Sequence, residues 1–118
     1  MFQAVRGIMV FTPSPEKAAR WWADVLEADV LLDVDGDSVF AWLNVGGTEF
    51  GFHPADEERN PSGGSTVPYW AVDDVDGVRA RLLEAGCTHH RGPLEIGPGR
   101  RICQIVDPFG TVIGLDGP

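Results

Sequence analysis

The sequence predicts an α+β fold built from two tandem β-α-β-β-β modules. In each half of the chain, one apolar strand pattern precedes an amphipathic helix pattern, and three strand patterns follow it. The two expected helix starts, at Ser14 and Asp74, lie 60 residues apart. A polar stretch rich in Pro and Gly, residues 54–65, separates the halves. Because residue identity between the halves is slight, the order and spacing of the elements carry the prediction of a repeat.

The first module begins with a strand over residues 4–11, which are mostly apolar and include β-branched residues. Ser14 is a good helix N-cap, and Pro15 is a good first helical residue. Apolar residues then recur at the spacing of one helix face, which predicts a helix that ends near Glu27. The residues of that face are Ala18, Trp21, Trp22, Val25 and Leu26. Both tryptophans are therefore interpreted as core residues.

Three strands are expected after this helix, over residues 28–34, 38–45 and 48–53. Asp35-Gly36-Asp37 separates the first two, and Gly46-Gly47 separates the last two. Such residues tolerate the positive φ angles of tight hairpin turns. The pattern therefore predicts two hairpins in succession.

The second module repeats this order. A strand over 66–72 leads to Asp74, an N-cap residue, and to a helix that Gly86 ends. The apolar positions of this helix are Val75, Val78, Leu82 and Ala85. The remaining strands are predicted over 88–96, with an interruption at Gly92-Pro93, over 100–106 and over 111–116. Residues 107–110, Asp-Pro-Phe-Gly, join the last two as a tight turn, because Asp accepts backbone hydrogen bonds and Gly permits positive φ.

Length and composition predict one domain of 118 residues, with modules over 1–53 and 66–118 and a linker over 54–65. No apolar run is long enough for a membrane span, and the N-terminus lacks a signal-peptide pattern, so we expect a cytoplasmic protein without membrane contact. A net charge of −9 argues against nucleic-acid binding and favours cationic or neutral ligands. Cys87 and Cys103 form no CxxC site and are expected to be buried thiols.

Two motifs carry a family resemblance. Residues 106–115 read Val-Asp-Pro-Phe-Gly-Thr-Val-Ile-Gly-Leu, and residues 71–76 read Ala-Val-Asp-Asp-Val-Asp. Together with the doubled module, they resemble the vicinal oxygen chelate superfamily of glyoxalase I, bleomycin-resistance proteins, extradiol dioxygenases and fosfomycin-resistance enzymes. The resemblance implies a cupped, mostly antiparallel sheet with the helices on its convex side and the ligand on its concave side. It also implies a homodimer.

Enzymes of that superfamily carry metal ligands in the first and fourth strands of each module. By this resemblance, the four ligand positions correspond here to Gly7, Gly51, Val67 and Gly114. None of these residues has a carboxylate, imidazole or thiolate with which to bind a divalent metal. The resemblance therefore predicts no metal, no other cofactor and no catalytic residue, and it favours a protein that is not an enzyme.

Strand alternation sorts side chains into two faces. The residues predicted to share the concave face of Gly7 and Gly51 are Met9, Phe11, Glu49 and His53, and Tyr69 shares the face of Val67. Trp42 is a further aromatic candidate, although alternation alone leaves open which face Trp42 and Phe40 occupy. The bulky residues expected under the helices are Ile8, Val10, Phe50, Phe52, Trp70, Val72, Ile113 and Leu115. The glycines at positions 7, 51 and 114 are predicted to leave space beside a ligand.

Aromatic walls with a few polar groups suit a planar, drug-sized ligand, and Glu49 would attract a cationic one. The sequence thus predicts a metal-independent protein that binds an aromatic or cationic, antibiotic-like small molecule, for drug sequestration or self-resistance. Two alternatives stay open: a metal-dependent lyase, isomerase or dioxygenase, and a structural or regulatory dimer whose cup is filled. A relocated metal site at His53, Glu49 and His89 or His90 is a less favoured variant of the first. Whether residues 54–65 form a lid also stays open.

Overall fold

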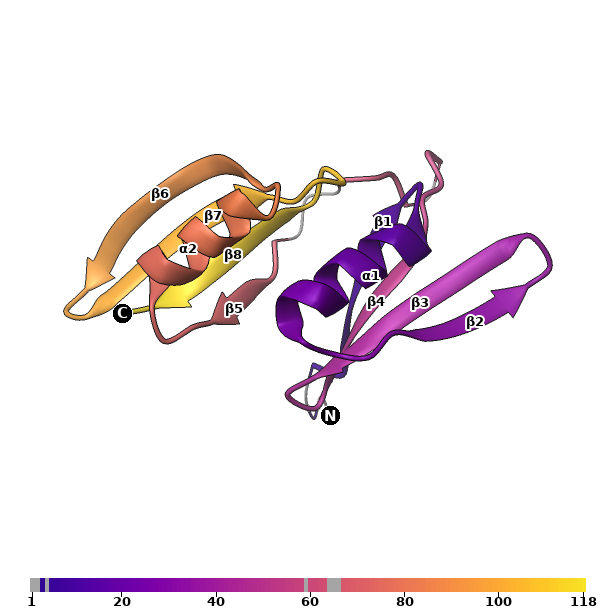
Figure 1. Cartoon of the computed structure of the whole chain (residues 1–118), viewed down its shortest axis with the longest axis horizontal. Helices are drawn as coiled ribbons and strands as arrows, with labels where there is room; N and C mark the ends of the chain where they lie inside the picture. The colour runs from indigo at the N-terminus through magenta and orange to yellow at the C-terminus, as the bar shows by residue number, and fades with distance from the viewer. Residues whose placement is uncertain (1–2, 4, 59, 64–66) are drawn as a thin grey trace. The chain divides into compact units, whose positions relative to one another are not determined.

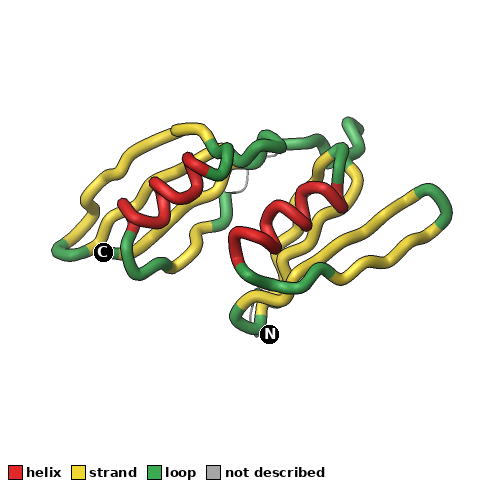
Figure 2. Tube along the Cα trace, in the orientation of Figure 1, coloured by secondary structure: helices red, strands yellow, loops and turns green. Residues whose placement is uncertain are grey.

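The computed structural model describes residues 3, 5–58, 60–63 and 67–118. The chain divides into two compact units, Met1–Gly64 and Ser65–Pro118. In the residues that the structure describes, each unit has one helix and four strands, whose course can be followed in Figure 1 and Figure 2. Within the described residues, both units run β-α-β-β-β, so the α+β class and the doubled module are confirmed.

The first unit contains β1 (Gly7–Thr12), α1 (Pro15–Leu26), β2 (Leu31–Asp35), β3 (Ser38–Val45) and β4 (Thr48–Pro54). Its sheet has the order β1-β4-β3-β2. Because β2, β3 and β4 follow one another through two hairpins, their pairs are antiparallel, whereas β1 pairs with β4 in parallel. At the second hairpin, Gly46 and Gly47 adopt φ values of 56° and 83°, as the predicted two-residue turn requires.

Helix α1 packs on one face of this sheet. Trp22 is only 2% exposed, and its ring centroid lies 5.5 Å from that of Phe50. The buried sheet residues of this face are Val10, Ala41, Leu43, Phe50 and Phe52. The assignment of Trp22 to the core is confirmed, whereas Trp21 stays half-buried beside it, with the two ring centroids 4.9 Å apart.

Two details of α1 differ from the prediction. Ser14 occupies the N-cap position, but its side chain makes no capping hydrogen bond. At the other end, Glu27 adopts a left-handed conformation and the backbone N–H of Ala28 donates to the carbonyl of Ala23 over 3.0 Å. Residue 28 therefore still belongs to the helix end, and β2 begins at Leu31 instead of residue 28.

The second unit contains β5 (Tyr69–Ala71), α2 (Val75–Glu84), β6 (Thr88–Gly97), β7 (Arg100–Val106) and β8 (Val112–Gly117). Its sheet repeats the first order, β5-β8-β7-β6, with a parallel β5–β8 pair. Asp74 caps α2 by accepting the N–H of Gly77 over 3.1 Å. The buried residues between α2 and the sheet are Val75, Leu82, Cys103, Ile105, Ile113 and Leu115. Thr66, the first residue of the predicted strand over 66–72, lies outside the described residues.

The Asp-Pro-Phe-Gly turn forms as predicted. The carboxylate of Asp107, which is 4% exposed, accepts the backbone N–H groups of Phe109 and Thr111 over 2.9 and 2.8 Å. Gly110 has a φ of 88°. The Asp107 side chain thereby supplies hydrogen-bond acceptors for backbone N–H groups of the turn. The turn joins β7 and β8, which pair in antiparallel register.

The region predicted as a linker contains some local order. Asp56 and Asn60 exchange two backbone hydrogen bonds of 2.9 and 2.7 Å. None of the helices that the structure describes is long and apolar enough to cross a bilayer.

Candidate functional site

The face of the first sheet opposite α1 gathers aromatic side chains. Paired residues on neighbouring strands point to the same side of a sheet. Gly51 pairs with Met9 on β1 and with Trp42 on β3, so both side chains flank this glycine. The register therefore assigns Trp42 to the open face, which alternation alone had left undecided.

His53 lies at the centre of this cluster. Its ring centroid is 4.6 Å from that of Phe40, with the planes inclined at 57°, and 6.5 Å from that of Phe11, at 75°. All three rings are half-buried, and Met9 is 48% exposed. We call the surface formed by Met9, Phe11, Phe40, Trp42, Glu49, Gly51 and His53 the aromatic face.

The aromatic face unites five predicted site residues, Met9, Phe11, Trp42, Glu49 and His53. Phe40 joins them and was not among the predicted site residues. The signal that could have placed it is the two-residue Gly46-Gly47 turn, which pairs Val45 with Thr48 and fixes the whole β3–β4 register. Counting back from that pair places Trp42 opposite Gly51. Phe40 precedes Trp42 by two residues on β3, so its side chain points to the same side of the sheet.

The charges on and around the aromatic face are acidic. Glu49 is exposed, and Asp33 pairs with Phe40 across β2 and β3 and therefore shares its side of the sheet. Residues 21–58 of the chain contain no Lys or Arg. The charged side chains of β2, β3 and β4 are therefore all acidic, and they attract cations.

The space available beside the glycines of this face differs between Gly7 and Gly51. A Cβ built on Gly51 would meet only backbone oxygens, those of Ile8 and Ala41, at 3.8 and 3.9 Å. A Cβ on Gly7 would lie 3.4 Å from the carbonyl oxygen of Glu49. Gly51 therefore leaves room for about one methyl group, as predicted, while Gly7 is more closely packed.

The prediction that Gly114 leaves space is wrong. Gly114 pairs with Tyr69 across the parallel β5–β8 ladder, and a Cβ on this glycine would lie 2.6 Å from Cγ of Tyr69. The ring of Tyr69 thus covers the glycine. Its hydroxyl oxygen accepts a hydrogen bond of 2.8 Å from Nε2 of Gln104 on β7, which fixes the position of the ring. Tyr69 lies in the second unit, apart in the chain from the five residues above.

The donor set does not fit a metal ion. Gly7, Gly51, Val67 and Gly114 offer no ligand atom, and the Tyr69 ring excludes a longer side chain at position 114. In the part of the chain that the structure describes, no three His, Cys, Asp or Glu side chains gather closely enough to hold a metal. His89 and His90 are exposed, and Nδ1 of His89 lies 3.0 Å from Nη2 of Arg79.

The cysteines are buried and free, as predicted. Burial, with a smaller contribution from Asp107, raises the pKa of Cys87 from 9.0 to about 12. Burial also raises the pKa of Cys103. Both thiols stay protonated at neutral pH, so neither is an activated nucleophile.

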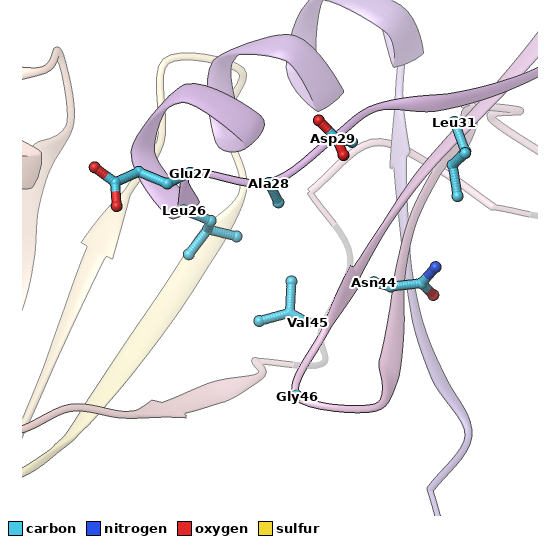
Figure 3. Close-up of a pocket in the computed structure, with 8 residues that line it drawn as sticks. All are labelled: Leu26, Glu27, Ala28, Asp29, Leu31, Asn44, Val45 and Gly46. Carbon is cyan, nitrogen blue, oxygen red and sulfur yellow. The ribbon is translucent and has the colours of Figure 1, made fainter.

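A separate hollow of about 510 Å³ lies in the first unit, between the end of α1 and the β3–β4 turn. In Figure 3, Leu26 and Val45 point into it from opposite sides, and the carboxylate of Glu27 points away. None of the predicted site residues lines this hollow. Its walls lack the stacked rings of the aromatic face, so the aromatic face remains the candidate ligand surface.

Comparisons with known proteins agree with this architecture. A structure of TnmS3, described as an antibiotic binding protein from Streptomyces sp. CB03234, is 28% identical, with a TM-score of 0.75 and 99% of this chain and 97% of that chain covered. A superfamily member from Sphaerobacter thermophilus DSM 20745 is 24% identical, with a TM-score of 0.77 and 98% of both chains covered. A family enzyme from Burkholderia phytofirmans PsJN is 18% identical, with a TM-score of 0.76, covering 97% of this chain and 98% of the other.

A comparison with functionally curated proteins found no match. The model of the Glyoxalase/Bleomycin resistance protein/Dioxygenase superfamily matches residues 5–115. This range runs from before β1 to Leu115 within β8, and it includes the Asp-Pro-Phe-Gly turn and the whole aromatic face. The chain therefore belongs to the glyoxalase/bleomycin resistance protein/dioxygenase superfamily.

Proposed function

We propose that the aromatic face binds a planar, cationic small molecule of the antibiotic type, without a metal and without chemical turnover. The observation that carries this proposal is the array of Phe40, His53 and Phe11, whose neighbouring ring centroids lie 4.6 and 6.5 Å apart. Rings at such spacings offer edges and faces to a flat ligand. Trp42 and Met9, on either side of Gly51, extend the surface.

Charge favours a cationic ligand over a neutral or anionic one. A cation over an aromatic ring gains about 0.5–2 kcal/mol, more where the site is desolvated. Glu49 and Asp33 add carboxylates on the same side of the sheet, and no Lys or Arg from residues 21–58 opposes them. These carboxylates would repel an anionic ligand.

The kinship with TnmS3 supports the ligand class. That protein is described as antibiotic binding, and it shares 28% of its residues with this chain over nearly the full length of both. The family also contains enzymes, but the positions at which its metal enzymes carry ligands are here glycine and valine. Binding and sequestration, rather than catalysis, are what this set of side chains supports.

The proposal includes a homodimer in the cytoplasm. The family resemblance supports the dimer, and the two free thiols suit a reducing compartment. Light scattering of the purified protein should give a mass of twice the 12.8 kDa chain. A mass of one chain at micromolar concentration would contradict the dimer without affecting the ligand proposal.

Calorimetric titration with a panel of planar aromatic cations, including 9-aminoacridine, tests the ligand proposal. Acridine serves as the uncharged comparison, because it has the same ring system but lacks the 9-amino group that keeps 9-aminoacridine protonated at neutral pH. We expect saturable binding of the cations and weaker binding of acridine. Phe40→Ala and Trp42→Ala should each lower affinity roughly tenfold, about 1.4 kcal/mol.

Trp21→Ala is the matched control, because it removes an equally large ring from α1 without touching the aromatic face, and it should bind like the wild type. If no member of the panel binds, or if Trp21→Ala weakens binding as much as Trp42→Ala, the proposal fails. Elemental analysis of the purified protein provides a second test. One tightly held metal ion per chain would contradict metal independence and would favour a metal-dependent enzyme.

A further inference from the structure

Strand β2 is the edge of the first unit's sheet. The strand order is β1-β4-β3-β2, and in the residues that the structure describes β2 pairs only with β3, as the hairpin in Figure 1 shows. Leu32 and Val34 on β2 are 40% and 63% exposed. They pair with Ala41 and Val39 and so point to the side of the sheet on which α1 packs, but α1 lies mainly over β3 and β4. An edge strand with exposed apolar residues offers a template for pairing with another strand.

The hairpin turn determines which backbone groups of β2 point outward. Residues 36–37 form a two-residue turn between Asp35 and Ser38, and the first of them, a glycine, has a φ of 60°. In such a hairpin the pair that flanks the turn is hydrogen-bonded, and from there hydrogen-bonded and non-hydrogen-bonded pairs alternate. Leu32 and Val34 belong to the non-hydrogen-bonded pairs. Their N–H and C=O groups therefore point away from β3, toward the outer edge of β2.

The charged side chains of β2 are acidic. Asp33 and Asp35 alternate with Leu32 and Val34 and so lie on the other side of the strand. Both aspartates are exposed, and within the described part of the chain neither side chain has an ion-pair partner. Because residues 21–58 contain no Lys or Arg, β2, β3 and β4 supply no counter-ion themselves. A strand that placed Lys or Arg opposite these aspartates would gain favourable cross-strand pairs.

The same carboxylates disfavour pairing between the β2 strands of two copies. In an antiparallel pair related by a twofold axis, the register that uses every outward group places Leu32 of each copy opposite Val34 of the other. This register puts the two Asp33 side chains directly opposite each other. Shifting it by one step places Asp35 opposite Asp33 or, in the other direction, opposite Asp29. Like charges directly opposite are destabilising, so a second copy is a poor partner for this edge.

We propose that the outer edge of β2 binds an extended, basic segment of a partner protein as an additional strand. The outward N–H and C=O groups of Leu32 and Val34 bind the backbone of the segment, and their side chains contact its apolar residues. Lys or Arg at alternate positions of the segment lie opposite Asp33 and Asp35. In this mode of recognition, main-chain hydrogen bonds provide affinity and alternate side chains provide specificity. The inference does not depend on the ligand proposed for the aromatic face.

Three short peptides, acetylated and amidated at their ends, test the proposal. The probe is Lys-Val-Lys-Val-Lys-Val-Lys, in which basic and apolar residues alternate. Lys-Lys-Lys-Lys-Val-Val-Val has the same charge and composition without the alternation. Glu-Val-Glu-Val-Glu-Val-Glu keeps the alternation and reverses the charge. Amide hydrogen exchange of the full chain is followed by nitrogen–proton correlation spectra in the presence of each peptide.

The exchange of individual amides distinguishes strand addition from diffuse charge attraction. Without peptide, we expect the outward amides of Leu32 and Val34 to exchange rapidly and the inward amides of Asp33 and Asp35 to exchange more slowly. The alternating basic peptide should slow exchange at Leu32 and Val34 at least tenfold, and the other two peptides should leave it unchanged. Slow exchange at Leu32 and Val34 without peptide would mean that the edge is already covered, and it would overturn the proposal.

Asp35→Asn tests the charge pairing. Asp35 is chosen because Asp33 also lies beside Phe40 on the aromatic face. Asp24→Asn is the matched control, since it removes the same charge from the exposed surface of α1. Asp35→Asn should weaken binding of the alternating basic peptide about threefold, and Asp24→Asn should bind it like the wild type. Equal effects of the two variants, equal protection by the two basic peptides, or protection by none of the peptides would each contradict strand addition at β2.

Discussion

The aromatic ring of Tyr69 lies against Gly114, its partner across the parallel β5–β8 pair. The ring is held there by the hydrogen bond between its hydroxyl and Gln104. By family resemblance, position 114 is where a metal ligand would stand, and here the ring of Tyr69 occupies the space that such a side chain would need. A side chain at position 114 and the observed position of this ring exclude each other.

Replacing Gly114 tests this relationship. Gly114→Ala should displace the Tyr69 ring and destabilise the protein by about 1–3 kcal/mol, the usual cost of overpacking. Urea denaturation measures the change. Gly97→Ala is the control, because a Cβ at Gly97 would meet nothing within 4 Å. In the double variant with Tyr69→Ala, most of the cost of Gly114→Ala should disappear; an additive result would mean that the ring and the glycine are independent.

The two faces of the first sheet should separate stability from binding. Trp22 is buried against Phe50, so Trp22→Ala should destabilise the protein by about 3–5 kcal/mol. Trp42 is only half-buried on the open face, so Trp42→Ala should cost less stability while weakening binding of planar cations. Thermal denaturation and calorimetry on the same two samples provide the comparison. Equal losses of stability would argue that Trp42 belongs to a core instead of a ligand surface.

The two helix N-caps predict unequal effects of the same kind of substitution. The Asp74 carboxylate accepts the N–H of Gly77, so Asp74→Ala should cost about 0.5–2 kcal/mol. The Ser14 side chain makes no capping hydrogen bond, so Ser14→Ala should change the free energy of unfolding by less than this. Chemical denaturation of both variants measures the difference, and a larger effect at Ser14 would refute the assigned cap geometry.

The buried thiol of Cys87 predicts a loss of stability in alkali. Its pKa is raised to about 12 in the folded protein, above the ordinary value of 9.0 that applies when the chain is unfolded. The neutral thiol therefore contributes stability that is fully present below pH 9, and this stability is lost as pH rises from there toward 12. Cys87→Ala should flatten the fall of the unfolding free energy above pH 9. Rapid alkylation of native protein by iodoacetamide at pH 8 would contradict the raised pKa.

The local patterns of the sequence predicted most of the fold. The bounds of β3 and β7 are as expected, since turns with Gly at defined positions limit both strands. The start of β2 was placed too early, because Ala28-Asp29-Val30 alternates like a strand although residue 28 closes the helix. The burial of Val10, Phe50, Phe52, Ile113 and Leu115 followed from alternation, whereas the order of the strands within each sheet was not predicted.

The candidate site was less predictable, because it depends on register and on side chains from neighbouring strands. Alternation placed Met9, Phe11, Glu49 and His53 together. All four lie on β1 and β4, on the same side as Gly7 and Gly51, which the family resemblance had assigned to the concave face. It could not place Phe40 and Trp42 without the pairing of β3 with β4. Nor could it reveal that Tyr69 covers Gly114, because the ring and the glycine come from strands far apart in sequence.

Nitrogen–proton correlation spectra recorded during titration with the cationic panel show whether planar cations bind to the aromatic face. We expect saturable shifts for the amides of Phe40, Trp42, Gly51 and His53, with the amides of α2 unchanged. The same spectra with acridine should show smaller shifts at equal concentration. If every cation leaves these four amides unmoved, or if the shifts fall elsewhere in the chain, the aromatic face is not a ligand site.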